Sequence, residues 1–184
     1  MLLLVMSDNF IQMFIGWEGV GLASYLLIGF WHSKASAISA NLKAFLVNRI
    51  GDLFFIIGVV IIFSIFNSFN FSVIFDEINY LKDPNDLANL ELACLFLFIG
   101  AMAKSAQIPL HIWLPDSMEG PTPISALIHA ATMVTAGIFL IIRLSPIYEV
   151  STYTMDTILI IGAITSLLLG IVGIYQNDIK KGWC

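Results

Sequence analysis

The chain has 184 residues, of which 59% are hydrophobic and 11% are charged, and its formal net charge at pH 7 is −5. Soluble domains carry about 45–50% apolar and about 25% charged residues, so this composition excludes an ordinary soluble domain and indicates an integral membrane protein. The acidic balance offers no basic stripe for phosphates and excludes a nucleic-acid partner. The two cysteines, Cys94 and Cys184, form no CxxC motif, and we expect no cofactor in this chain.

Five apolar runs are long enough to cross a bilayer, because about 20 helical residues span about 30 Å of hydrocarbon. The predicted fold is an all-α transmembrane helix bundle that forms a single membrane domain. The spans are expected at residues 10–31, 42–66, 92–114, 122–144 and 157–175, with an aqueous loop at 67–91. In the last span Gly162, Ser166 and Gly170 recur every fourth residue, a pattern suited to close helix contact.

Five spans place the two termini on opposite sides of the membrane. Basic residues favour the side of the C-terminus, which has Lys34, Lys43, Lys180 and Lys181, against Lys82 and Arg143 on the other side. By the positive-inside rule the C-terminus faces the mitochondrial matrix or the bacterial cytoplasm.

Lys104 lies inside the third span, and a charge near the middle of a bilayer usually faces a bundle interior or a water-filled path. Burial disfavours the charged form of lysine, so Lys104 is the best candidate for a group that accepts and releases a proton. A nearby Glu18 would favour the charged form of Lys104. Moving the two side chains together or apart would therefore switch the lysine between its charged and neutral states. The alternative is a lysine that extends to the membrane surface.

Pro109 interrupts the third span just after Lys104, because proline lacks a backbone donor and clashes with the preceding turn. In transporters an interrupted helix exposes backbone groups to an ion path. The alternative is a packing kink near the end of the helix.

Glu18 is the one ionisable residue of the first span, so it needs a cation from another helix or must be protonated. Arg49 and Asp52 are three residues apart in the second span and are expected to pair with each other. Lys43 lies in the first turns of the same span.

His129 lies in the fourth span, and an imidazole titrates near pH 6.5, which suits a proton relay. The alternative is a hydrogen-bonded core histidine. His111 and Asp116, near the membrane surface, are candidates for a proton path to solvent, although solvated side chains are common there. Trp17 and Trp113 are interpreted as interfacial or packing residues.

Several stretches closely resemble the chain 5 family of respiratory complex I, the proton-pumping NADH:ubiquinone oxidoreductase. They are residues 16–21 (GWEGVG), 24–28 (SYLLI), 47–52 (VNRIGD), 104–109 (KSAQIP), 113–116 (WLPD) and 118–137 (MEGPTPISALIHAATMVTAG). The resemblance implies half of an antiporter-like inverted repeat, located in the mitochondrial inner membrane or a bacterial plasma membrane. It also implies other membrane-arm subunits and lipid as partners.

The resemblance assigns proton transfer to three residues. Glu18 matches the glutamate of the family's fifth transmembrane helix, Lys104 the lysine of its broken seventh helix, and His129 the histidine of its eighth helix. It makes Glu18 the carboxylate partner of Lys104, with Asp52 nearby, and the protons are driven by quinone reduction in other subunits. Supporting roles are expected for Arg49, Asp52, Lys43, His111, Asp116 and Pro109.

The chain departs from this family in length, since it begins at the end of the fourth family helix and stops after the ninth. We therefore expect one piece of a split chain, with a second fragment that carries the remaining helices, or a partial gene product. Two other functions remain open. One is a subunit of a multi-subunit sodium/proton antiporter, and the other is a non-conducting membrane scaffold whose charges only pair for stability.

Overall fold

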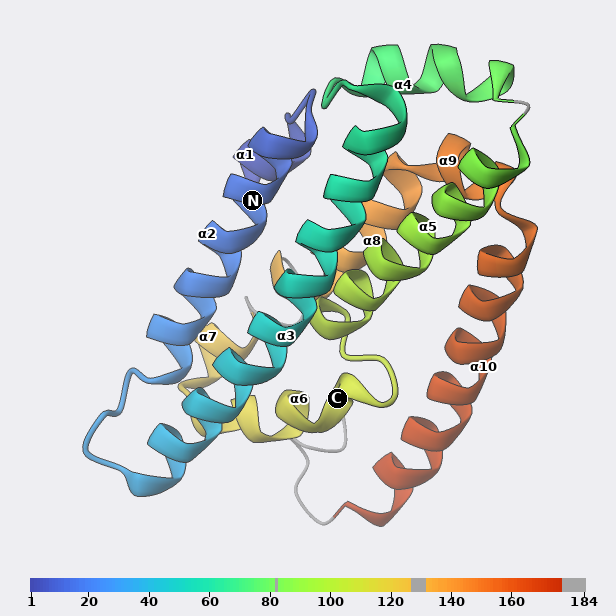
Figure 1. Cartoon of the computed structure of the whole chain (residues 1–184). Helices are drawn as coiled ribbons and strands as arrows, with labels where there is room; N and C mark the ends of the chain where they lie inside the picture. The colour runs from blue at the N-terminus through green and yellow to red at the C-terminus, as the bar shows by residue number, and fades with distance from the viewer. Residues whose placement is uncertain (82, 127–131, 177–184) are drawn as a thin grey trace.

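The structure is a computed structural model that describes residues 1–81, 83–126 and 132–176. Within these ranges the chain forms a bundle of helices (Figure 1), which confirms the predicted all-α fold. The helices in these ranges that are long and apolar enough to cross a membrane are α2 (Phe10–Ile28), α3 (Ala35–Phe66), α5 (Pro84–Lys104) and α10 (Thr152–Tyr175). The described parts of the predicted span 122–144 form α7 (Thr122–Ala126) and α8 (Met133–Arg143).

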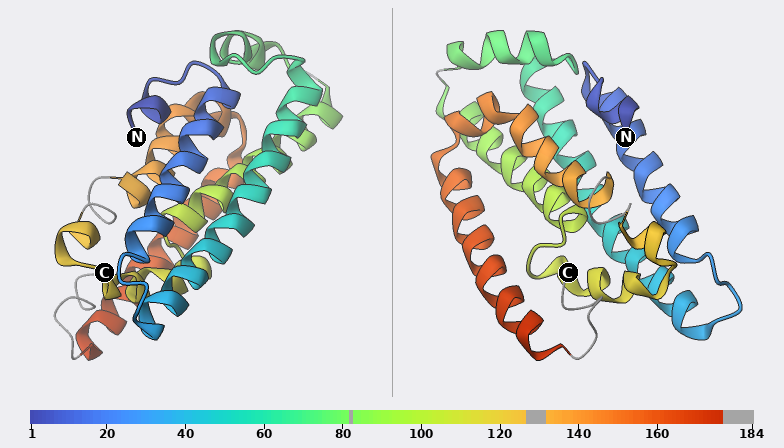
Figure 2. Two further views of the ribbon diagram at one scale, coloured as in Figure 1. Left: turned by 90° about the vertical axis from the view of Figure 1, so that its left-hand side faces the viewer. Right: turned by 180° about the vertical axis from the view of Figure 1, so that it is seen from behind.

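Shorter elements close the two ends of the bundle. They are α1 (Leu2–Val5), α4 (Phe71–Glu77), η1 (Ile78–Tyr80), η2 (Leu110–Ile112), α6 (Trp113–Asp116), η3 (Ser117–Glu119) and α9 (Ser145–Val150). In Figures 1 and 2, α4 lies across the end of α3, and α6 and α7 lie at the opposite end of the bundle. The segment that follows α5, with α6 and α7, therefore covers one end of the bundle.

Three of the helices begin before the apolar runs from which the spans were predicted, whereas α2 and α5 end before those runs do. Helix α3 begins at Ala35 instead of residue 42, and α10 begins at Thr152 instead of residue 157. Helix α5 begins at Pro84, inside the predicted loop 67–91, because proline suits the first turn of a helix. An apolar run marks only the part of a helix that can lie in hydrocarbon, so it fixes these boundaries poorly.

The core of the bundle lies between α3 and α5, which pack side by side (Figure 1). Large apolar side chains such as Phe55, Ile62 and Leu97 are fully buried there. At Gly51 the two helices are in tight contact, since an added Cβ would lie 2.2 Å from the Cβ of Ala103. Only glycine at position 51 permits this contact. As a result, the next residues, Asp52 on α3 and Lys104 on α5, lie close together in the core.

Helix α10 stands on the outer side of α5 and contacts mainly α5 and α9 (Figure 2). Its small residues were expected to make a close helix contact. A Cβ added at Gly162 or Gly170 would instead meet nothing within 4 Å. In the described part of the chain this face of α10 packs against no other helix.

Candidate functional site

The buried charges of the bundle meet next to the tight contact of α3 and α5 at Gly51 and Ala103. The Nζ atom of Lys104 lies 3.5 Å from Oδ1 of Asp52, and the two side chains are 0% and 6% exposed. Asp52 follows Gly51 on α3 and Lys104 follows Ala103 on α5, so the close contact of the two helices sets the distance between the charges. A fully buried ammonium does not extend to a membrane surface, which contradicts that alternative for Lys104.

Lys104 is the last residue of α5, although the sequence predicted that the helix would break at Pro109. Ala106 has a left-handed backbone (φ 52°), and the N–H of Gln107 donates to the carbonyl of Met102 at 3.0 Å. These two features make a Schellman-type helix end. Lys104 therefore lies at the negative end of the helix dipole, which favours its positive charge.

One side chain and one stretch of backbone contact this end of α5. The indole Nε1 of Trp113 donates to the carbonyl of Ala103 at 3.0 Å, so it occupies an acceptor that the helix leaves free. A Cβ added at Gly21 of α2 would lie 2.7 Å from Nζ of Lys104. The ammonium therefore rests against the backbone of α2.

Trp17, predicted as an interfacial or packing residue, lies in contact with the ion pair. Its Nε1 donates to Oδ1 of Asp52 at 2.8 Å, and its ring centre lies 5.6 Å from Nζ of Lys104. The sequence placed Trp17 beside Glu18 but gave no sign of this contact, because it depends on how α2 is rotated against α3.

Glu18 does not pair with Lys104, and Arg49 does not pair with Asp52, so both predicted pairings are wrong. Arg49 Nη1 donates to Oε2 of Glu18 instead, in a pair whose side chains are 56% and 30% exposed. Residues three apart on a helix differ by about 60° in direction. This difference lets Arg49 face α2 while Asp52 faces α5.

A small cavity lies between α2 and α3 and borders both the pair of Glu18 and Arg49 and the side chain of Asp52. Its volume is about 50 Å³, enough for an ordered water molecule. It is lined by Glu18, Gly21, Leu22, Ser24, Tyr25, Ala44, Phe45, Asn48, Arg49 and Asp52. The Oδ1 atom of Asn48 is buried and has no hydrogen-bond partner among the described residues, so it is a natural acceptor for that water.

The other predicted residues that the structure describes make separate contacts. Lys43 of α3 pairs with Asp116 of α6 at 2.5 Å, and their side chains are 45% and 37% exposed. His111 lines a separate cavity of about 30 Å³ beside α10, and Pro109 precedes it. His129 lies outside the residues that the structure describes.

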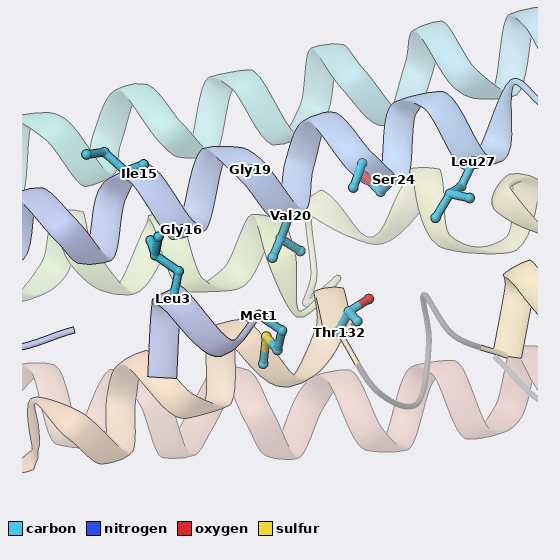
Figure 3. Close-up of a pocket in the computed structure, with 10 residues that line it drawn as sticks. Met1, Leu3, Ile15, Gly16, Gly19, Val20, Ser24, Leu27 and Thr132 are labelled. Atoms are coloured by element: carbon cyan, nitrogen blue, oxygen red, sulfur yellow. The ribbon is translucent and has the colours of Figure 1, made fainter. Parts of the chain in front are cut away.

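A larger groove of about 260 Å³ follows α2 (Figure 3), lined by Met1, Leu3, Ile15, Gly16, Gly19, Val20, Ala23, Ser24, Leu27 and Thr132. None of these lining residues has an acidic or basic side chain. Among the described residues, no three His, Cys, Asp or Glu side chains converge in a way that could hold a metal ion.

Comparison with known proteins places this arrangement in a family. Residues 7–182 match the family model "NADH:quinone oxidoreductase/Mrp antiporter, TM". The chain is 54% identical to NADH-quinone oxidoreductase subunit L of Neisseria meningitidis serogroup A, over 98% of this chain and 28% of that protein. It is 53% identical to NADH-ubiquinone oxidoreductase chain 5 of Metridium senile, over 98% of this chain and 30% of that protein. The chain thus spans less than a third of the length of these relatives.

A solved structure has the same fold. A chain of the Mrp complex from Dietzia sp. DQ12-45-1b matches 98% of this chain with a TM-score of 0.86 and 29% identity, and the match covers 19% of that chain.

Proposed function

Because the chain belongs to the NADH:quinone oxidoreductase/Mrp antiporter transmembrane family, we propose that it is a proton-translocating membrane segment of a respiratory NADH:quinone oxidoreductase, of the subunit L or chain 5 type. The observation that carries this proposal is the buried pair of Lys104 and Asp52. A charged pair in the core of a membrane helix bundle is costly to keep and typically marks an ion or proton path.

In the proposed mechanism Lys104 carries the proton, and Asp52 compensates its charge. When the pair is intact, the carboxylate stabilises the ammonium. When the pair opens, an ammonium without a partner is strongly disfavoured in the core and releases its proton. The opening is driven by quinone reduction in other subunits, as the family resemblance implies.

The outer pair of Glu18 and Arg49 has a different role in this mechanism. It is partly exposed and borders the cavity that also reaches Asp52. A change in the charge of Glu18 therefore alters the electrostatic potential at the buried pair. A water molecule in the cavity can also pass a proton between the carboxylates of Glu18 and Asp52. His129 is proposed as the next group along the path, as the family resemblance implies.

The apolar helices place the chain in a membrane. We propose the mitochondrial inner membrane, or the plasma membrane of a bacterium, with the C-terminus on the matrix or cytoplasmic side. The proposed partners are other membrane-arm subunits of the same complex. Relatives named as NADH-quinone and NADH-ubiquinone oxidoreductase subunits, at more than 50% identity, support this assignment.

A sodium/proton antiporter subunit is the second candidate function, favoured by the likeness to the Mrp complex. The Mrp chain is only 29% identical to this chain, against 54% for subunit L, so the antiporter is less well supported than the oxidoreductase. Native gel electrophoresis of mildly solubilised membranes separates the two. We expect the chain in the band that oxidises NADH, identified by mass spectrometry, and its presence in a band without NADH oxidation would favour the antiporter.

The proton-transfer role itself is tested by Lys104→Ala in the assembled complex, reconstituted into liposomes. We expect acidification of the liposome interior per NADH oxidised to fall sharply. If the assembled variant pumps normally, the charges serve only the stability of a scaffold, and the proposed function is wrong.

A further inference from the structure

Trp17 lies in contact with both members of the buried ion pair. Its indole Nε1 donates a hydrogen bond of 2.8 Å to Oδ1 of Asp52, and the same oxygen lies 3.5 Å from Nζ of Lys104. The ring centre of Trp17 lies 5.6 Å from that Nζ, within the range of a cation–π interaction. The side chain is fully buried, so the indole is a fixed part of the core.

Two donors thus converge on one carboxylate oxygen, and the indole takes the short contact. A charge-assisted hydrogen bond between an ammonium and a carboxylate is usually about 2.7–2.9 Å long. The contact of Lys104 is longer, and its Nζ makes no hydrogen bond within the described ranges 1–81, 83–126 and 132–176. The ammonium is therefore held by charge and by the aromatic ring, without a short directional bond to Asp52.

We propose that Trp17 is a positioning residue that keeps the pair of Lys104 and Asp52 separable. By donating to Oδ1, the indole N–H takes up part of the negative charge of that oxygen and competes with the ammonium for it, which weakens the direct bond between Lys104 and Asp52. The indole also supplies the carboxylate with a donor when the lysine is neutral or turned away, so Asp52 stays in place while Lys104 changes its charge. This inference rests on the proposed proton-transfer function.

The test uses the whole complex in liposomes and compares Trp17→Phe with Trp17→His. Phenylalanine keeps an apolar ring but lacks the N–H, so Lys104 is free to close onto Asp52. We expect proton translocation to fall by roughly tenfold, the factor that a hydrogen bond to a charged group carries. Histidine retains a ring N–H, and we expect this variant to translocate protons faster than Trp17→Phe. Trp31→Phe, at an exposed position that follows the end of α2, is the control.

A double variant shows whether Trp17 acts through Asp52. If it does, adding Trp17→Phe to Asp52→Asn lowers the residual translocation no further. The proposal is overturned if Trp17→Phe pumps normally, if its effect is equally large in the Asp52→Asn background, or if neither Trp17 variant assembles, since Trp17 would then serve packing. Normal pumping by Asp52→Asn alone would overturn the proposed function together with this inference. A fall in Asp52→Asn with no effect of Trp17→Phe would overturn only the inference.

Discussion

Arg49 and Asp52 lie three residues apart on α3, yet each forms an ion pair with a different helix. Arg49 pairs with Glu18 of α2 at the edge of the bundle, and Asp52 pairs with Lys104 of α5 in the core. One turn of α3 thus connects a partly exposed pair to a buried one. The two pairs differ so much in burial that their removal should have different consequences.

Replacing Asp52 with Asn leaves Lys104 without a counter-charge in the core. Removing one partner of a buried pair costs about 3–5 kcal/mol, so the lysine loses its proton and translocation should fall by more than about tenfold. Asn keeps the shape of the side chain and an acceptor for Trp17, which preserves assembly. The measurement is proton translocation per quinone reduced, with Asp83→Asn at the exposed start of α5 as the control. Unchanged translocation would show that the buried pair carries no proton.

Replacing Arg49 with Gln should change stability little. Exposed ion pairs contribute about 0–1 kcal/mol, and the Arg49 side chain is 56% exposed, so the melting temperature of the complex should stay nearly constant. Translocation should nevertheless decrease several-fold, because Glu18 loses the cation that holds it at the cavity. Thermal unfolding and pumping are measured on the same preparation. A loss of pumping as severe as that of Asp52→Asn would contradict the separate roles of the two pairs.

Replacing Gly21 with Ala tests the contact between the Lys104 ammonium and the backbone of α2. The new Cβ would lie 2.7 Å from Nζ of Lys104, so the ammonium must move while the helices stay in place. We expect normal assembly with lowered proton translocation. Gly19→Ala is the matched control on the same helix, because a Cβ there meets nothing within 4 Å. Equal pumping by the two variants would show that the position of the ammonium has no effect.

Replacing Gly51 with Ala tests the contact that brings α3 and α5 together. The added Cβ would lie 2.2 Å from that of Ala103, and overpacking of this kind costs about 1–3 kcal/mol. We expect a lower melting temperature and a wider separation of the buried charges. Adding Ala103→Gly removes the opposing Cβ and should restore both stability and translocation. If the double variant is no better than Gly51→Ala, the close approach is not what positions the pair.

The fold follows from the sequence because long apolar runs admit few structures other than membrane helices. The pairing of the charges does not follow in the same way. Asp52 meets Lys104 because Gly51 meets Ala103, and a contact between residues so distant in the chain has no local pattern. The end of α5 could not be predicted from the sequence either. The left-handed residue after the helix is Ala106, whereas glycine is the usual residue at this position.

The hydrogen bond from Trp113 to the carbonyl of Ala103 has a consequence for how the lysine moves. An interrupted helix is often taken for a hinge, but here the last turn of α5 is tied to an indole ten residues further along the chain. This bond ties the interruption to the segment that follows it, and we expect the backbone at Lys104 to move little. In the proposed mechanism the charge is then displaced by rotation about the bonds of the lysine side chain, a faster motion than the movement of whole helices.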